Sequence, residues 1–143
     1  MADSRAITDT ITGTCQGLTA PFRFVYDSAD PHAVLMDLTD LARASGDTDD
    51  TPRPWSFART LLTDAVLVDG RFGHGDVVVE HAGAWVTISL TSPDGSCRIR
   101  FTHTAVMRFV ERTARLVPLG RESEYQAAAV DDAVRRLLDG AAW

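Results

Sequence analysis

The sequence predicts an α+β fold built on antiparallel β-sheets, with about seven strands and two helices late in the chain. Three observations indicate this class. Short segments of alternating apolar and polar residues recur as far as His103, separated by turn-forming Gly, Pro and Asp. After Thr104 the apolar spacing changes to three and four residues, which is typical of a helix. A chain of 143 residues is long enough to bury a core of its own.

The first half of the chain alternates strands with turns. Ile7–Gln16 is rich in threonine and fits an edge strand. The turn Asp27–Pro31 then joins two strands into a hairpin with a longer loop, because proline favours an extended residue before it. The elements expected here are strands at Ile7–Gln16, Phe22–Asp27, Ala33–Leu38 and Trp55–Ala58, and a short helix at Arg59–Ala65.

A polar segment interrupts this half between Arg43 and Pro54. It contains Ser, Gly, Asp, Thr and Pro with hardly any apolar residue, which predicts a flexible surface loop. We expect residues 1–20 to form an N-terminal segment with a tail and a first strand, and residues 21–143 to form one domain that includes the loop at 43–54.

The second half reads as a meander followed by helices. Strands are expected at Val77–Glu80, Ala84–Leu90 and Arg98–His103, with turns at His81–Gly83 and Ser92–Gly95. Thr104 is the expected N-cap of the next helix. A final helix includes Asp131–Leu138, with acidic residues at its start and arginines at its end; whether it begins earlier, at a capping box Ser123–Gln126, is left open.

Composition narrows the classes of partner. With 14 basic and 20 acidic residues the net charge is −6, which argues against a nucleic-acid partner held by bulk electrostatics. No apolar run approaches the ~20 residues of a membrane span, so we expect no membrane insertion. Cys15 and Cys97 lack metal-ligand spacing, which favours reduced, largely buried thiols in a cytoplasmic protein.

No catalytic, cofactor-binding or metal site is predicted. His32, His74, His81 and His103 show no metal-ligand spacing, and Gly73–Asp76 precedes a strand, the reverse of a dinucleotide loop. The acidic pairs at 49–50 and 131–132 fit a solvated loop and a helix start. Trp55 and Phe57 share one strand face, as core residues or as an interface anchor. Arg98 and Arg100 point away from Ile99 and Phe101, which opposes a nucleic-acid platform.

Several motifs, read in order, resemble one family. The string YDSADPHAV is similar to the YDxxDPYAV signature of the SsgA-like proteins, regulators of sporulation and cell division in Streptomyces and related actinomycetes. WSFARTLL is similar to that family's W-x-F-A-R-[DE]-L-L, and the aspartate and leucines of Asp131–Leu138 match its C-terminal end. The other matching strings are GHGDV at 73–77, LTSPDG at 90–95 and FVERTARLVPLGRE at 109–122.

The resemblance covers about Pro21 to Asp139 and implies which residues maintain the shared fold. The sequence departs from the pattern at His32, at Thr60 and in a longer loop from Arg43 to Arg53. The motif residues expected to be structural are Tyr26, Asp27, Asp30, Pro31, Trp55, Phe57, Arg59, Leu61, Leu62, Gly75, Asp76, Pro93, Gly95, Pro118 and Gly120.

The resemblance also implies a Whirly-like fold, a homotrimer and a non-enzymatic function without a cofactor. We therefore expect a cytoplasmic protein–protein adaptor, recruited to division septa, that contacts other SsgA-like proteins and the tubulin-like division protein FtsZ. Partner choice is expected in the Arg43–Arg53 loop or in the C-terminal helix. The alternative is binding of single-stranded nucleic acid, as in Whirly relatives.

Overall fold

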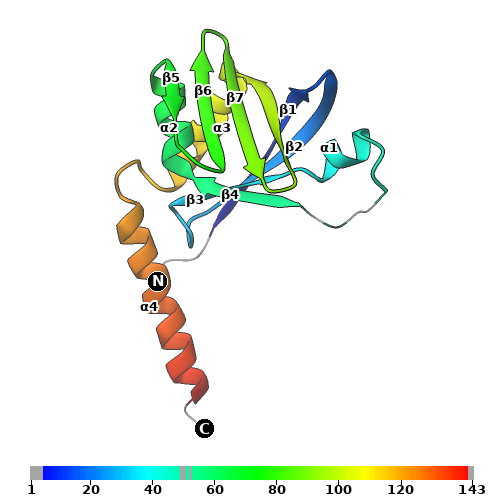
Figure 1. The fold of residues 1–143 in the computed structure, drawn as a ribbon. Helices are drawn as coiled ribbons and strands as arrows, with labels where there is room; N and C mark the ends of the chain where they lie inside the picture. Colours follow the sequence, from blue (N-terminus) through cyan, green and yellow to red (C-terminus); the bar gives the residue numbers. More distant parts are fainter. Residues whose placement is uncertain (1–4, 49–50, 52, 142–143) are drawn as a thin grey trace.

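The computed structural model describes residues 5–48, 51 and 53–141, and its elements are shown in Figure 1. The strands come before the two longest helices in the chain, as expected for an α+β fold. The elements are β1 (Ala6–Cys15), β2 (Leu18–Asp27), β3 (Ala33–Asp37), α1 (Thr39–Ala44), β4 (Pro54–Ala58), α2 (Arg59–Leu67), β5 (Gly70–Phe72), β6 (Val77–Ala82), β7 (Trp85–Ser92), β8 (Gly95–Thr102), α3 (His103–Leu116) and α4 (Glu122–Ala141).

One antiparallel sheet runs in the order β4-β3-β2-β1-β8-β7-β6-β5. It consists of two four-stranded meanders that join at β1 and β8. Within the first meander β1 pairs with β2 along ten residues, from Ala6 opposite Asp27 to Cys15 opposite Leu18. Across the junction only Thr14 and Arg100 are paired. The two meanders are therefore held together largely by side-chain packing.

The structure corrects the prediction that the first strand lies at an edge. β1 lies in the middle of the sheet, with β2 on one side and β8 on the other. Its threonines tolerate solvent on the outer face, while Ile11 and Cys15 are buried on the inner face. The alternating composition indicates that one face of the strand is buried and the other is exposed, but it does not indicate how many strands lie beside it.

Eight strands form instead of about seven, because β5 is only three residues long and carries no alternating pattern. β2 also begins earlier than expected, at Leu18. The reason is a two-residue turn at Gln16 and Gly17, with φ angles of 50° and 80°. Positive φ at both positions matches the twist of a tight hairpin.

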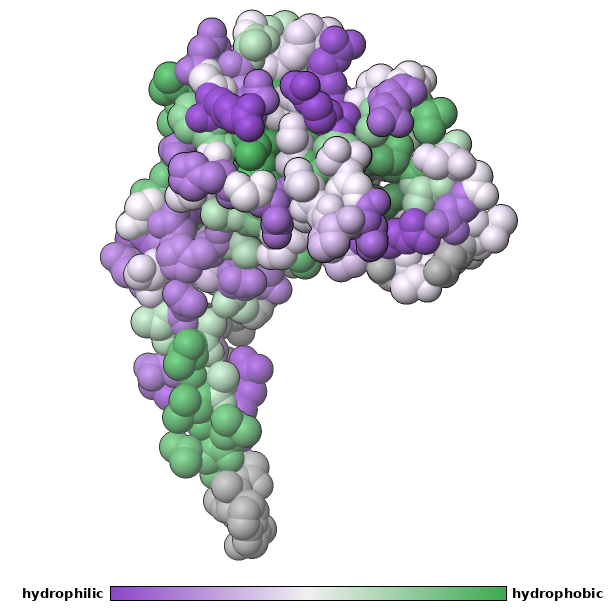
Figure 2. Space-filling model, viewed as in Figure 1, coloured by the Kyte–Doolittle hydropathy of each residue, from purple (hydrophilic) through white to green (hydrophobic). Residues whose placement is uncertain are grey.

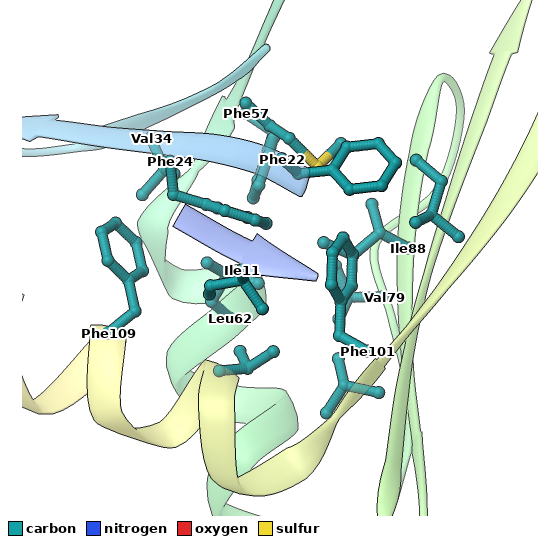
Figure 3. Close-up of a cluster of buried hydrophobic side chains, with 14 of the residues drawn as sticks. Ile11, Phe22, Phe24, Val34, Phe57, Leu62, Val79, Ile88, Phe101 and Phe109 are labelled. Carbon is teal, nitrogen blue, oxygen red and sulfur yellow. The ribbon is translucent and has the colours of Figure 1, made fainter. Parts of the chain in front are cut away.

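The core lies on the inner face of the curled sheet, against α2 and α3 (Figure 3). Phe101 stands edge-on to Phe22 and Phe24, with ring centroids 5.3 and 5.4 Å apart. Gly13 makes this packing possible, because a β-carbon there would lie 2.6 Å from the Phe101 ring. The aromatic cluster thus bridges the two meanders where backbone pairing is sparse.

Helix α3 begins two residues earlier than the expected N-cap implies. The cap is Thr102, whose hydroxyl accepts a hydrogen bond from the Ala105 N–H at 3.3 Å, and not Thr104. His103, expected in the strand, is the first helical residue. Both threonines can cap a helix; the chain leaves the sheet at Thr102 because β7 begins opposite it, at Trp85, and offers no further residue to pair with.

Part of the segment expected to be a loop is helical. α1 extends to Ala44, and Asp37 organises both ends of the segment by accepting hydrogen bonds from the Thr39 N–H (3.0 Å), the Thr39 hydroxyl (2.6 Å) and the Arg53 N–H (3.2 Å). Burial alone would raise the Asp37 pKa, but these hydrogen bonds outweigh it and lower the pKa. The acidic pair predicted at 49–50 lies outside the described residues.

Helix α4 includes the expected Asp131–Leu138 and starts at Glu122, one residue before the Ser123 capping box, which decides the start that the sequence left open. It leaves the body of the molecule and projects away from it (Figure 1). Asp131 and Arg135 therefore lie inside the helix rather than at its ends, and the acidic residues of the first turn are Glu122 and Glu124. No helix in the described ranges is long and apolar enough to cross a membrane.

Candidate functional site

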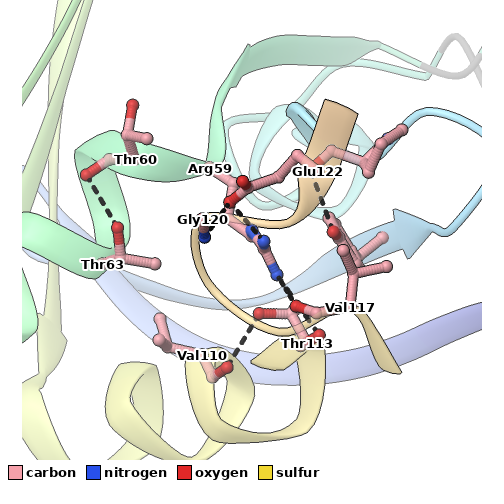
Figure 4. Close-up of polar contacts among 10 residues, drawn as sticks. Arg59, Thr60, Thr63, Val110, Thr113, Val117, Gly120 and Glu122 are labelled. Atoms are coloured by element: carbon pink, nitrogen blue, oxygen red, sulfur yellow. Dashed lines mark hydrogen bonds and ion pairs between the residues drawn. The ribbon is translucent and has the colours of Figure 1, made fainter. Parts of the chain in front are cut away.

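The base of α4 is held by a buried arginine at the start of α2. Arg59 is 1% exposed and directs its guanidinium at the end of α3 (Figure 4). Its Nη1 donates to the carbonyl oxygens of Val117 at 2.8 Å and Thr113 at 3.3 Å, and its Nη2 donates to Glu122 Oε1 at 2.6 Å. One side chain therefore ties α2 both to the C-terminal carbonyls of α3 and to the first turn of α4.

Glu122 completes this arrangement from α4. Burial alone would raise its pKa, but hydrogen bonds from its own backbone N–H, from Arg59 and from the Gly120 N–H outweigh burial and lower the pKa. Gly120 reaches Glu122 Oε1 at 3.3 Å from a turn with φ of +86°, a conformation that favours glycine. The carboxylate is therefore ionised at neutral pH and compensates the buried guanidinium.

Tyr26 closes the other side of the arginine. The Arg59 guanidinium carbon lies 4.9 Å from the centroid of the Tyr26 ring, a cation–π contact. The Tyr26 hydroxyl donates to the Pro31 carbonyl at 2.9 Å. Burial raises the pKa of Tyr26 to about 12, against the opposing effect of Arg59, so the phenol stays protonated and remains a donor.

We call Tyr26, Arg59, Thr113, Val117 and Glu122 the arginine junction. Six of the predicted motif residues contribute to it or to the turns that shape it. Pro31 and Gly120 bond it directly, and the Pro118 carbonyl accepts from the Arg121 N–H at 3.1 Å in the turn before α4. Asp30 bonds within the β2–β3 turn, where its N–H donates to the Asp27 carbonyl at 3.0 Å.

The other motif residues are not brought to the junction. Phe57 and Leu62 are buried in the core, and Trp55 and Leu61 pack against it, so the core interpretation of the aromatic pair holds. Asp27 caps its own turn through the Ala29 N–H at 2.8 Å. Gly75 and Asp76 lie in the loop between β5 and β6, Pro93 lies in the β7–β8 turn, and Gly95 is the first residue of β8.

Sequence reasoning missed the partners of Arg59. Thr113, Val117 and Glu122 lie within a recognised motif, but nothing marked them as ligands of one side chain. A signal existed: Arg59 follows the apolar Phe57 and precedes the apolar Leu61 and Leu62, and an arginine on a buried helix face requires an acidic partner. His32, where the sequence departs from the family pattern, contacts Arg59 through the backbone: the His32 carbonyl accepts from the Arg59 N–H at 2.8 Å.

The histidines and cysteines form contacts, but the described residues hold no group of three His, Cys, Asp or Glu side chains placed to bind a metal ion. The rings of His81 and His103 stack at 4.4 Å, and His103 Nε2 lies 2.8 Å from the Val66 carbonyl. Burial, and to a smaller extent the neighbouring Cys15, raises the pKa of the Cys97 thiol to about 11. Both cysteines are free thiols.

The outer half of α4 presents a second feature, an exposed apolar stripe (Figure 2). Val130, Val134, Leu137 and Leu138 are 57%, 46%, 73% and 66% exposed. We call these four residues the α4 stripe. Large apolar side chains clustered on one face of a projecting helix are typical of a protein-contact surface.

The sequence predicted basic and aromatic residues on opposite faces of the second meander, β8-β7-β6-β5, but its outer face carries both. Phe101 is buried, as expected, but Trp85 shares the outer face with Arg100 and is 42% exposed. The Arg100 guanidinium carbon lies 4.1 Å from the Trp85 ring centroid. Arg71 and Arg98 share Glu80 on the same face, at 3.4 and 3.8 Å. Basic and aromatic groups therefore do meet on this face.

Comparisons with known proteins agree with this architecture. The family model described as Streptomyces sporulation and cell division protein, SsgA, matches residues 20–122. The sporulation-specific cell division protein SsgB of Salinispora tropica is 40% identical over 119 residues, covering 80% of this chain and 77% of that protein. The SsgB of Streptomyces coelicolor is 32% identical over 112 residues, covering 76% and 75%.

Solved structures show the same fold. The crystal structure of an SsgA-like sporulation-specific cell division protein from Thermobifida fusca superimposes with a TM-score of 0.78 and 27% identity, covering 94% of this chain and 98% of that one. A structure of SsgB, described in connection with longitudinal cell division during sporulation of Streptomyces coelicolor, gives a TM-score of 0.73 at 26% identity, covering 85% and 96%.

Proposed function

Because this chain belongs to the SsgA family of sporulation and cell division proteins, we propose that it is a non-enzymatic regulator of sporulation-specific cell division. In this proposal it acts as a protein–protein adaptor that takes part in septum-site selection and in recruitment of FtsZ. The observation that carries the proposal is the α4 stripe, a contact surface presented on a helix that projects from the body.

The arginine junction supports this role by giving α4 a fixed origin. Arg59 belongs to α2, whose Leu62, Ala65 and Val66 are buried in the core. The direction of α4 is therefore coupled to the packed body through Glu122 and through Tyr125, which packs against the core. An adaptor needs such a fixed geometry, because a contact surface on a freely swinging segment loses affinity to the entropy of ordering.

The names of the relatives support the division role, since SsgB proteins that this chain resembles are called sporulation-specific cell division proteins. We propose further that the protein is cytoplasmic, is recruited to division septa and forms homo-oligomers, with a trimer as the expected state. Within this proposal the predicted motif residues, from Tyr26 to Gly120, maintain the fold rather than choose the partner. No cofactor is required.

A binding experiment with two purified proteins tests the proposal. The full chain is mixed with FtsZ from an actinomycete, and complex formation is followed by co-sedimentation with FtsZ polymers and by biolayer interferometry. We expect saturable binding, and we expect a fluorescent fusion to collect at sporulation septa. Absence of binding to FtsZ together with an even distribution in sporulating cells would contradict the adaptor role.

Single-stranded nucleic acid is a second candidate, favoured by one observation. Trp85 and Arg100 stack on an exposed sheet face, a pairing that suits a base against an aromatic ring. The net charge of −6 opposes nucleic-acid binding. Glu80 opposes it as well, because this carboxylate already pairs with Arg71 and Arg98 on the same face. Fluorescence anisotropy of labelled oligonucleotides at low salt tests it: binding must weaken steeply with salt and disappear in W85A.

A further inference from the structure

The outer face of the second meander carries arginines gathered around one carboxylate. We call Arg71, Glu80, Trp85, Arg98 and Arg100 the outer patch. Arg71 and Arg98 are 68% and 69% exposed, and each places a guanidinium nitrogen near Glu80 Oε1, at 3.4 and 3.8 Å. No other carboxylate in the described part of the chain pairs with these arginines. The patch is therefore basic, in a chain whose net charge is −6.

Trp85 orients Arg100. The Arg100 guanidinium carbon lies 4.1 Å from the centroid of the Trp85 ring, so the planar group is held against the indole. Within the described ranges the Arg100 side chain forms no ion pair. A guanidinium carries its N–H donors in a rigid fork that matches the two oxygens of a carboxylate. Arg100 is therefore positioned to bind a carboxylate from another molecule.

The spacing of the arginines defines which ligand fits. Arg98 and Arg100 are two residues apart on β8 and share one face, about 6.8 Å apart along the strand. An extended peptide places its alternate side chains at the same interval. Carboxylates at positions i and i+2 of such a peptide therefore come level with the two arginines. Thr102 is next on this face and is paired with Trp85, so the side chain at i+4 meets the indole.

Single-stranded nucleic acid fits the outer patch less well than an acidic peptide does. Proteins that bind single strands stack successive bases on several aromatic rings. Trp85 is the one exposed aromatic ring in the described ranges, and Arg100 already covers one side of it. Glu80 and the net charge of −6 repel a backbone that carries a charge at every nucleotide. The observations therefore favour a protein segment with a few carboxylates.

We propose that the outer patch binds an extended acidic segment of a partner protein. One carboxylate of this segment pairs with Arg98, a second carboxylate two residues along pairs with Arg100, and an apolar side chain two residues further packs on Trp85. The β6–β7 hairpin, where Trp85 lies, is at the end of the body away from α4 (Figure 1). The inference rests on the proposed adaptor role, because an adaptor needs a second contact surface besides the α4 stripe.

Nuclear magnetic resonance of the full chain, titrated with synthetic peptides, tests the site. In the probe peptide Thr and Glu alternate, and a Leu follows the second Glu by two residues. The control peptide has the same composition with its two Glu adjacent. We expect the probe to shift the Trp85 indole N–H and the amides of β7 and β8, and to bind more tightly than the control. Equal binding of the two peptides, or no shift at these groups, would overturn the proposal.

Two arginine variants test the contact itself. Arg100→Gln should weaken binding of the probe peptide about fivefold, the upper range for one exposed ion pair. Arg108→Gln is the matched control, because it removes the same charge from an exposed position on α3, and it should bind the probe as the wild type does. Equal affinities for the two variants would overturn the proposal. Tighter binding of a single-stranded oligonucleotide of equal charge at this patch would overturn it as well.

These outcomes are independent of the test for FtsZ binding. The titrations contain no FtsZ, so their failure leaves the proposed contact of the α4 stripe to be judged by itself. Conversely, a chain that binds the probe peptide but not FtsZ would lose the FtsZ contact and keep the outer patch as a binding site. Circular dichroism on each variant confirms that the fold is intact.

Discussion

The two ends of α4 follow opposite physical rules. At its base Glu122 is 13% exposed and bonded to the fully buried Arg59, so the two charges compensate each other. In its outer half Leu137 is 73% exposed and touches water. The base is held by contacts within the chain, whereas the outer half keeps large apolar side chains exposed. The contrast supports the proposal that one helix is both a fixed part of the fold and a surface for another molecule.

The largest expected effect comes from breaking the base. Arg59→Ala removes the guanidinium that donates to the Glu122 carboxylate and to two carbonyls at the end of α3, and removing one partner of a buried ion pair costs about 3–5 kcal/mol. Urea denaturation measures it. Arg121→Ala is the control, because Arg121 forms an exposed pair with Glu124 and its loss should leave the midpoint unchanged. Equal midpoints for the two variants would contradict the structural role of the junction.

Glu122→Gln tests the same ion pair through the pH dependence of the stability. The Glu122 pKa lies below the ordinary value of a glutamate, so its ionised form contributes stability that is present at neutral pH and is lost as the pH falls through the folded pKa. At neutral pH we expect the variant to be about 1.5–3 kcal/mol less stable than wild type, the usual range for hydrogen bonds to a charged group.

That difference should shrink as both proteins are titrated from pH 7 toward pH 3, because the wild-type carboxylate becomes protonated while glutamine does not change. Denaturation curves at several pH values provide the measurement. A stability difference that stays constant down to acidic pH would mean that the charge of Glu122 is not what holds α4.

Tyr26→Phe tests the far side of the junction. The variant keeps the ring beneath Arg59 but removes the hydroxyl, so the buried Pro31 carbonyl loses its donor. We expect a loss of about 1–2 kcal/mol in the free energy of unfolding. Replacing Tyr125, which is only partly buried, by Phe serves as the comparison and should cost less. If the two tyrosine variants lose equal stability, the Pro31 bond has no special value.

The smallest effect on folding is expected in the outer half of α4. Leu137→Asp should leave the free energy of unfolding unchanged, because Leu137 is already 73% exposed, and should weaken the FtsZ binding proposed for the α4 stripe. Leu67→Asp is the control, because it changes a side chain of similar exposure, 66%, that lies outside the stripe. Biolayer interferometry compares the two variants, and equal FtsZ binding by both would argue against the stripe as the contact surface.

Much of the fold was accessible from sequence because local patterns determine it. Alternation located β2, β3, β7 and β8, and apolar spacing located α2 and α3. The central position of β1 was not accessible, because it depends on β8, whose only paired residue with β1 is Arg100 opposite Thr14. β5 was missed for the same reason: three residues carry no period of their own and pair only with β6.

The candidate site, like the fold, was predictable from the sequence only in part. Motif resemblance singled out Tyr26, Arg59 and Gly120, but their meeting at one guanidinium arises from contacts up to 63 positions apart. The start of α4 stayed open between Asp131 and the Ser123–Gln126 capping box, because the internal charges Asp131 and Arg135 resemble helix ends. Alanines 127–129 are strong helix formers and would have carried the helix back toward Glu122.

Hydrogen exchange along α4 addresses both ends of the helix in one experiment. Backbone amides of 122–126 should exchange slowly in wild type and much faster in Glu122→Gln, because the arginine junction holds that turn. Amides of 130–138 should exchange faster than those of 122–126 in the wild type, because the large apolar side chains of this half are exposed. Exchange at 122–126 that is unchanged in Glu122→Gln would contradict the idea that the arginine junction fixes the base of α4.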